Sequence, residues 1–573
     1  MKKLQHRAGQ LEKHTAGCFF SDWRTLFYAL LPLLGLLFTV WYIKAASADV
    51  VYSDYIRLVD AYLPDVGNPA KFFVPDVFTR VPAAFLQRFL NVRLFGFSVT
   101  FDRLCTAAGL FLCAAVLARY AKRFQLSFFW YTAVMCLLFS LNKWEILLNG
   151  TAWAHVVTFG LFFLNYALFD RVYRNEVCLS DAAKRTGAFQ SSDGGADDIG
   201  RAGASSLAFK HGADHIEHMR RLFWMLCLFP FVILLFAAEY IAAYAGVMTL
   251  ACLFGIWMSK RAHAGDNKKA MRFRKSSASK RMAVQRDDAE NGQRDKENRA
   301  ACGGFLAVLI CTLASFGIYL LSRHFAVWEH AGATSLSLGE VIAENPVFLP
   351  RFFIKTFAGA AIGQETIQNF YGNGKPLSDA AVLLLGCLVI GMYLLGIALY
   401  VKSRMYQRTL FPMILLLSGG MNHVIVTIGR WIFLKESYAL SSRYSAQFMI
   451  GLIGIFLIFG LRRQCANLGN ASFKQDALQT RHHRHSAYFG KIQIIVTVLT
   501  VFILAGNCYT TEQEIKKAPY REQNYEEMAD MLRNSAAYTP EELCQKLDWH
   551  KSPDDLYQAI TILRENHLNV FRR

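Results

Sequence analysis

The sequence is poor in charged residues and lacks the short motifs of the common soluble enzymes. Asp, Glu, Lys and Arg make up 18 % of its 573 residues, against about 25 % in soluble domains. It contains no Walker loop, no GxGxxG, no GxSxG and no HExxH, so it gives no sign of the nucleotide, hydrolase or zinc sites that those motifs build. CxxC pairs are also missing, and most of the thirteen cysteines lie in apolar runs, which indicates buried hydrophobic side chains.

Hydrophobic residues form the other extreme of the composition. They account for 54 % of the chain and include 46 phenylalanines, and they gather in runs near the length that crosses a bilayer. Helices of this length satisfy their own backbone hydrogen bonds in lipid. The sequence therefore predicts an all-α, polytopic integral membrane protein. About eleven transmembrane helices are expected, at 25–43, 99–120, 126–141, 152–169, 222–238, 240–258, 302–321, 379–400, 409–426, 444–461 and 492–505.

Basic residues outnumber acidic ones, and their positions predict the orientation of the chain. The formal net charge is +19, and Lys and Arg concentrate on one side of the expected spans, as the positive-inside rule requires. No recognition motif accompanies the charge, so the expected partner is the lipid bilayer and not nucleic acid. The N-terminus is expected in the cytoplasm and the C-terminus outside. The first apolar run starts late and lacks a small-residue cleavage site, which indicates an uncleaved first span.

The spans divide the chain into three parts. A cytoplasmic N-terminus covers 1–24, a transmembrane domain covers 25–505, and an outside helical tail covers 506–573. Helices are expected in the tail because Thr539-Pro-Glu-Glu542 places a hydroxyl at the N-cap, Pro at N1 and an acid at N3. Four longer segments interrupt the transmembrane domain, namely the outside loops 44–98 and 322–378 and the polar cytoplasmic loops 171–221 and 259–300.

The first outside loop carries two acids directly after the first span, Asp49 and Asp54. Apolar residues recur with helical spacing over 52–63, so an amphipathic helix is expected there. Asp54 and Arg57 share its polar face, and its apolar face is expected to rest on the membrane or on the bundle. A second amphipathic piece is expected over 76–90, so the loop is predicted to hold interfacial helices.

Other outside segments add further acids and arginines near the membrane surface. A carboxylate can take the proton from an acceptor hydroxyl, and arginines can bind a phosphate and stabilise its developing charge. Such a set suits a reaction that activates a hydroxyl and discharges an anionic leaving group. The candidate catalytic residues are Asp54 and Asp49, and the candidate substrate-binding residues are Arg57, Trp144, Glu145, Arg430, Arg443 and Tyr444.

Five of the candidates also have an interpretation that involves no chemistry. Asp54 and Arg57 are spaced as an exposed i, i+3 ion pair. Trp144 with Glu145 suits an anchor at a span end, where Trp is favoured, and Arg443 suits a side chain that extends to the interface. No residue is assigned to a metal, although the carboxylates leave a divalent metal as a candidate cofactor.

Several short segments carry a resemblance to known membrane proteins. They are Asp49-Val-Val-Tyr-Ser-Asp-Tyr-Ile-Arg57, Tyr62-Leu-Pro-Asp65, Trp144-Glu145, Gly429-Arg430, Ser441-Ser-Arg-Tyr444 and Leu563-Arg-Glu-Asn-His-Leu-Asn-Val-Phe571. In these the chain resembles a group of uncharacterised bacterial polytopic proteins. In its layout, with an uncleaved first span and an acidic loop with interfacial helices after it, the chain resembles the GT-C superfamily of membrane glycosyltransferases, which use polyprenyl-phosphate-linked sugars.

The resemblance implies a GT-C-like fold in a bacterial inner membrane. It also implies an inverting glycosyltransferase that moves a sugar from a polyprenyl-phosphate-linked donor to an envelope glycan or lipid acceptor. Asp54 is favoured as general base because it shares a helix face with Arg57, and Arg430 and Arg443 would hold the donor phosphate. The alternatives are a transporter or flippase for an envelope glycan or lipid, and a non-catalytic membrane scaffold. The position of the polar groups at span ends disfavours transport.

Overall fold

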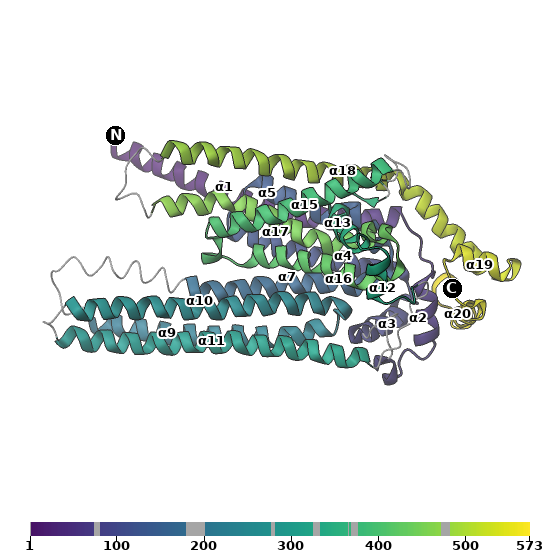
Figure 1. Ribbon diagram of the computed structural model, residues 1–573, viewed down its shortest axis with the longest axis horizontal. Coiled ribbons are helices and arrows are strands. Elements are labelled where there is room, and N and C mark those ends of the chain that lie inside the picture. Colours follow the sequence, from purple (N-terminus) through teal and green to yellow (C-terminus); the bar gives the residue numbers. More distant parts are fainter. Residues whose placement is uncertain are drawn as a thin grey trace.

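The computed structural model describes residues 2–73, 81–178, 201–276, 281–324, 333–364, 366–367, 376–471 and 482–572. All regular structure in these residues is helical, and the long helices run side by side as one elongated bundle (Figure 1). This confirms the predicted all-α class. The long helices are α1 (Lys2–Ala45), α4 (Val99–Arg123), α7 (Trp153–Tyr173), α9 (Arg201–Leu234), α10 (Ile241–Ser276), α11 (Arg281–His324), α15 (Pro376–Lys402), α16 (Phe411–Arg430), α17 (Ser442–Ala471) and α18 (His482–Arg533).

Ten helical segments in the described part of the chain are long and apolar enough to cross a membrane, so a multi-pass membrane protein is confirmed. The fifth expected span, 222–238, falls on α9 and is the one expected span that is not among these ten. Arg220 and Arg221 come directly before its apolar run, and α9 ends at Leu234, which leaves that run short. The count of eleven therefore stays a prediction. Residues 179–200 of the expected polar loop 171–221 lie outside the described residues.

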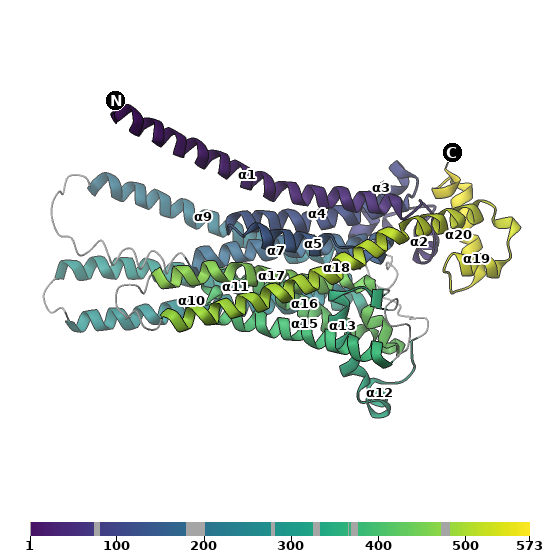
Figure 2. The same cartoon turned by 90° about the horizontal axis from the view of Figure 1, so that it is seen from above.

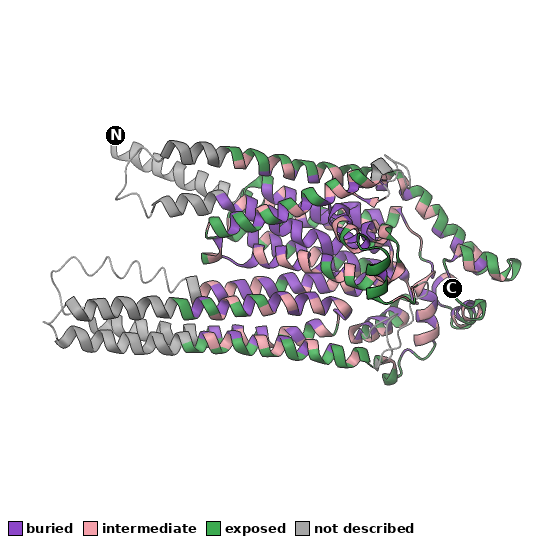
Figure 3. Ribbon diagram, in the orientation of Figure 1, coloured by how far each residue is buried: buried purple, intermediate pink, exposed green. Residues whose placement is uncertain are grey.

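The centre of the bundle is α17, which packs against α16, α15, α13 (Phe348–Ala361) and α5 (Phe128–Phe139). Within its apolar window 94 % of the residues are buried, against 33 % in α1. Figure 3 shows the same gradient, with buried residues gathered in the inner helices and exposed residues along the outer ones. An inner position explains why α17 carries almost no polar face, and it places the residues at its start, Ser442 and Arg443, at one end of the core.

The third expected span differs from its prediction. Its helix α5 ends at Phe139, and Ser140 is extended with ψ 149°. The chain then forms a short helix, α6 (Trp144–Leu148), between the expected third and fourth spans. The break is stabilised because the buried Lys143 ammonium donates to the Ser140 carbonyl at 2.7 Å. Trp144 and Glu145 are therefore held on a helix that packs against α17.

Four shorter helices gather at one end of the bundle and form what we call the outer unit, after the predicted outside location of its segments. They are α2 (Asp54–Tyr62), α3 (Pro82–Phe95), α19 (Pro540–Lys546) and α20 (Pro553–Glu565) (Figure 2). The predicted boundary at 505/506 falls inside α18, which continues as one helix to Arg533 and carries the chain into this unit. The N-cap expected at Thr539 is present, and the side chain of Ser552 caps α20.

The apolar face of α2 does not lie on lipid or on the bundle core, but on the C-terminal tail. Tyr55, Ile56 and Val59 belong to one buried cluster with residues of α20 such as Leu556 and Ile560. This cluster explains why the tail is not a separate appendage: α2 alone is too short to bury its apolar face, and the amphipathic α20 supplies the missing surface.

Hydrogen bonds of the backbone and of one side chain, Asn569, join the two ends of the chain in the outer unit. The amide of Ser53 donates to the carbonyl of Leu547 at 2.8 Å, and the amide of Val51 donates to the side-chain oxygen of Asn569 at 3.0 Å. Asn569 also donates through its Nδ2 to the carbonyl of Phe97 at 3.0 Å. The tail therefore fixes the segment that carries Asp54 from both sides.

Helix α3 keeps the character of an interfacial helix. Leu86, Leu90 and Leu94 recur every four residues and are exposed on one face, at 61 %, 40 % and 62 %. This apolar stripe suits contact with lipid, because α3 leads directly into the membrane-spanning α4. The beginning of the predicted amphipathic piece, with Asp76 and Phe78, lies outside the described residues.

The contact between α2 and α20 is expected to depend on pH. Burial, and then the negative charge of Asp555, raise the pKa of Asp60 to about 6, while in the unfolded chain it is about 3.9. The native state therefore binds the proton more tightly, and stability falls as the pH rises from about 4 to about 6. Asp60→Asn should raise the melting temperature more at pH 7 than at pH 4.5. An equal change at both pH values would contradict this prediction.

Candidate functional site

Glu145 and Arg443 form an ion pair at the outer end of the bundle. The other oxygen of Glu145, Oε2, accepts hydrogen bonds from the hydroxyls of Ser442 at 3.0 Å and Ser441 at 3.3 Å. The Arg443 side chain is 51 % exposed and that of Glu145 24 %. Two of the predicted substrate-binding residues are therefore brought together from α6 and α17, and the arginine of the pair remains accessible.

Asp54 is the first residue of α2 and is partly exposed. Its negative charge acts on Arg443, as the charge of Glu145 does. The structure thus brings Asp54 near Arg443, although almost four hundred residues separate them in the sequence. Arg57 lies one turn further along α2 and is also partly exposed.

Asp49, the other candidate catalytic acid, follows α1, and its side chain lies against the first turn of α4. Its Oδ1 accepts from the backbone amides of Val99 at 2.6 Å and Thr100 at 3.2 Å, and from Nδ2 of Asn569 at 3.4 Å. A carboxylate at this position satisfies free amides and complements the positive end of the helix dipole. These bonds give Asp49 a clear structural function.

Arg430 and Tyr444 join this group from the other side. The Arg430 guanidinium lies 5.6 Å from the centre of the Tyr444 ring, a cation–π distance. The charges of Arg430, Arg443 and Glu145 all act on the Tyr444 hydroxyl. Tyr444 follows Arg443 directly on α17 and so connects the Glu145–Arg443 pair to the end of α16.

A cavity of about 450 Å³ opens beside these residues, and we call it the outer cavity. Helix α10 packs against both α11 and α16 and closes the space between them. Aliphatic and aromatic side chains make most of the wall, among them Phe316, Leu320, Ile425 and Ile428. The polar and charged lining consists of Glu239, Tyr240, Tyr319, Arg323, Arg430, Tyr444 and Gln447.

Trp144 has a partner that the sequence did not indicate. The guanidinium of Arg521 lies 3.3 Å from the centre of the Trp144 ring, and Arg521 also pairs with the buried carboxylate of Glu514. Glu145 and Glu514 line one small cavity of about 50 Å³. The contact of Trp144 with Arg521 therefore attaches the part of α18 that enters the outer unit to α6.

A buried polar network behind Asp54 was also not predicted. Asp102 at the start of α4 accepts hydrogen bonds from the Tyr55 hydroxyl at 2.8 Å, from Nδ2 of Asn91 at 2.8 Å and from Nε2 of Gln87. The charge of Arg88 also acts on it. This network attaches α2 and α3 to the first turn of α4 and so fixes the helix that begins with Asp54.

Arg103, the next residue along α4, is fully buried. Its Nε donates to the carbonyl of Leu148 at 2.7 Å, and its Nη1 donates to the carbonyl of Ala48 at 2.7 Å. One side chain therefore connects the end of α6, which carries Glu145, to the loop that leads to Asp54. The sequence offered a signal here, since Asp102-Arg103 is a charged pair inside an apolar run.

Four charged side chains support the segment before Arg443. Arg351 and Lys355 on α13 each pair with Asp379 on α15 and with Glu436, and the Arg351 Nε to Glu436 Oε1 distance is 2.9 Å. Burial opposes the charge of Glu436, but hydrogen bonds from Arg351 and Lys355 hold its pKa below its usual range. The pairs anchor the short helix of residues Glu436–Leu440, from which the chain enters Ser441 and Arg443.

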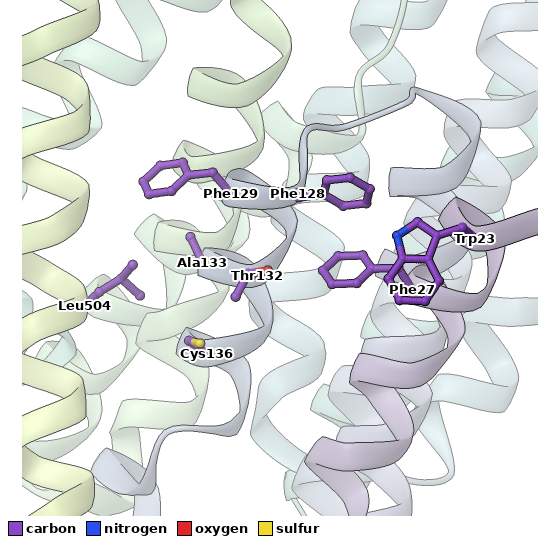
Figure 4. A pocket seen from close by; sticks show the side chains of 8 residues that line it. All are labelled: Trp23, Phe27, Phe128, Phe129, Thr132, Ala133, Cys136 and Leu504. Carbon is purple, nitrogen blue, oxygen red and sulfur yellow. The ribbon is translucent and has the colours of Figure 1, made fainter. Parts of the chain in front are cut away.

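A second, wider cavity of about 520 Å³ lies away from the candidate site, between α1, α5 and α18 (Figure 4). Its side chains are almost all apolar and include Trp23, Phe27, Phe128 and Phe129. It contains no charged residue and none of the predicted site residues, so it suits hydrocarbon contact and offers no chemistry.

Among the residues described, no group of three or more His, Cys, Asp or Glu side chains is placed to hold a metal ion. Comparisons with descriptions of protein families, with curated proteins and with solved structures find no match to this chain.

Proposed function

We propose that the protein is a membrane glycosyltransferase that transfers a sugar from a polyprenyl-phosphate-linked donor to an envelope glycan or lipid acceptor, in the inner membrane of a bacterium. Asp54 acts as general base. Arg443 and Arg430 bind the donor phosphate. Glu145 orients Arg443, and Arg57, Trp144 and Tyr444 are further substrate-binding residues.

The proposed reaction is a displacement at the anomeric carbon of the donor sugar. The acceptor oxygen forms a bond to that carbon while its proton passes to the Asp54 carboxylate. The bond from the anomeric carbon to the phosphate oxygen breaks, and polyprenyl phosphate leaves with the electron pair. The arginines stabilise the charge that develops on the phosphate, and attack from the opposite side inverts the configuration.

The observation that carries the proposal is the position of Arg443. It lies near two carboxylates, Asp54 and Glu145, and next to Tyr444, which lines the outer cavity. Glu145 is engaged by two serines and the arginine, and Asp54 is partly exposed at the start of α2. A cavity with apolar walls and arginines at one end suits a lipid with an anionic head. Asp54 is preferred over Asp49 because Asp49 caps α4.

Transport is less well supported than transfer. Most buried charged groups of the described spans lie near span ends, among them Asp102, Lys143, Asp170 and Arg462. Asp170, for example, accepts from the amide of Leu410 at 2.6 Å and so caps the start of α16. His423 is buried in the middle of α16, but its ring is stacked between those of Phe357 and Phe448. Transporters place such groups near the midplane of the bilayer, on interrupted helices. A transporter and a scaffold therefore remain alternatives without a specific observation in their favour.

Asp54→Asn is expected to reproduce the chemical phenotype of a strain that lacks the protein. Mass spectrometry of envelope glycans and polyprenyl-linked intermediates should show loss of one sugar from the product and accumulation of its donor in both strains. Removal of a general base typically slows a reaction about 10²–10⁴-fold.

The matched control for this experiment is Asp530→Asn, because Asp530 is also in the outside part of the chain but is exposed and pairs only with Arg533 in the described structure. It should leave the envelope unchanged. An Asp54→Asn strain with a normal envelope and a normal amount of protein in the membrane would refute the assignment of the base.

A further inference from the structure

The charged groups of the outer cavity are of both signs. Arg323 and Arg430 supply two positive charges, and Glu239 supplies one negative charge. Glu239 forms no ion pair with any residue that the structure describes. A lipid phosphate alone would be attracted by the arginines and repelled by Glu239, so an acid at this position needs an explanation of its own.

Glu239 is held by a strained turn. Ala238, directly before it, has φ +44°, a left-handed conformation that costs an L-residue energy and often occurs at binding sites. Helix α9 ends at Leu234 and α10 begins at Ile241, so this turn presents Glu239 at the wall of the cavity.

Three tyrosines line the outer cavity together with Glu239. The charge of Glu239 acts on the hydroxyls of Tyr240, Tyr319 and Tyr444, and all three residues line the cavity together with Phe316. Aromatic faces combined with a carboxylate are the groups that bind ammonium ions in proteins.

Gln447 provides a second indication of a polar ligand. It is only 1 % exposed and lines the outer cavity. Neither its side-chain oxygen nor its side-chain nitrogen has a hydrogen-bond partner in the described structure. Buried amides are normally bonded, so an unpaired amide in the wall of this cavity indicates a place for a polar ligand.

We propose that the outer cavity binds a membrane lipid whose phosphodiester headgroup carries a primary ammonium, with the phosphate at Arg430 and Arg323 and the ammonium at Glu239 among the tyrosines. The apolar walls then hold the first part of the hydrocarbon chain. The inference deepens the proposed function. It rests on that function only where it places the phosphate of a lipid substrate at Arg430. It adds that the head of this lipid carries a primary ammonium, which in a polyprenyl-phosphate-linked donor places an amino group on the sugar.

Lipid binding by the purified full-length protein tests this directly. Phosphatidylethanolamine and phosphatidylglycerol with identical acyl chains share the phosphodiester, but only the first carries an ammonium. Competition between them, followed by native mass spectrometry, should show a preference of about tenfold or more for phosphatidylethanolamine. Glu239→Gln should reduce that preference to less than about threefold, by weakening the binding of phosphatidylethanolamine and not that of phosphatidylglycerol.

Two further variants separate the causes of a change. Arg430→Gln should weaken both lipids, and Glu344→Gln, at an exposed acid on α12 (Leu338–Glu344), should change neither. Equal binding of the two lipids by the parent protein, or an unchanged preference in Glu239→Gln, would overturn the proposal. Lipid binding does not depend on turnover. If the parent protein prefers phosphatidylethanolamine and the Asp54→Asn strain has a normal envelope, the proposed transferase is refuted and the proposed lipid site is not.

Discussion

Gly419→Val is expected to prevent correct assembly of the helix bundle. A Cβ atom at Gly419 on α16 would lie 2.3 Å from the backbone nitrogen of Gly451 on α17 and 2.4 Å from its Cα. Atoms of a second helix backbone cannot move aside as a flexible side chain can. Since α17 is surrounded by other helices, a shift of α17 would disturb most of the core. Small residues at such crossings are what allows membrane helices to approach closely.

The expected cost of Gly419→Val is about 3 kcal/mol or more, at the upper end of overpacking substitutions. Protein yield in the membrane and thermal unfolding in detergent measure it. Gly391→Val on α15 is the matched control, because a Cβ at Gly391 meets no atom within 4 Å, and it should unfold like the parent. A Gly419→Val protein of normal yield and melting temperature would contradict the packing of α16 on α17.

Asp102→Ala is expected to release the outer loop from the bundle. The substitution leaves the Tyr55 hydroxyl and the amides of Gln87 and Asn91 without their shared acceptor, and it removes a carboxylate on which the charge of Arg88 acts. Removal of one partner from a buried charged network typically costs about 3–5 kcal/mol. Because the network attaches α2 to α4, Asp54 should lose its position and transfer should fail.

Hydrogen exchange distinguishes this local effect from global unfolding. In Asp102→Ala the amides of α2 and α3 should exchange faster, while those of α16 and α17 should stay protected. Asp102→Asn, which keeps one acceptor oxygen, should lie between the parent and Asp102→Ala. Asp530→Ala removes only an exposed i, i+3 pair and should have little effect. Unchanged protection of α2 in Asp102→Ala would contradict the proposed role of the network.

Much of the fold could be predicted because long apolar runs leave few structural choices in a membrane. The positions of most spans follow from hydrophobicity alone. The exceptions have local causes. The third span breaks at Ser140 because buried polar groups, Lys143 among them, find partners in the bundle, and α9 ends early at Leu234. Periodicity also identified α2, but it could not show that the apolar face of α2 packs on α20.

The candidate site was predicted unevenly, for a physical reason. Charged residues at span ends stand out in an apolar sequence, so Asp54, Glu145 and Arg443 could be named, and the structure brings them together. The contact of Val51 with Asn569 joins residues at opposite ends of the chain, and no local pattern encodes such a pairing. Glu239 was visible only as an acid in a short turn, since its neighbours come from three other helices.

The most direct test of the central claim is the release of polyprenyl phosphate by the purified protein. The protein is incubated with a membrane lipid extract that contains polyprenyl-phosphate-linked sugars, and mass spectrometry follows the free polyprenyl phosphate. The parent protein should release it together with a glycosylated product, and Asp54→Asn should do so at least about 100-fold more slowly. Equal release by the parent and by an Asp54→Asn protein of unchanged melting temperature would contradict the assignment of this site as a glycosyltransferase centre.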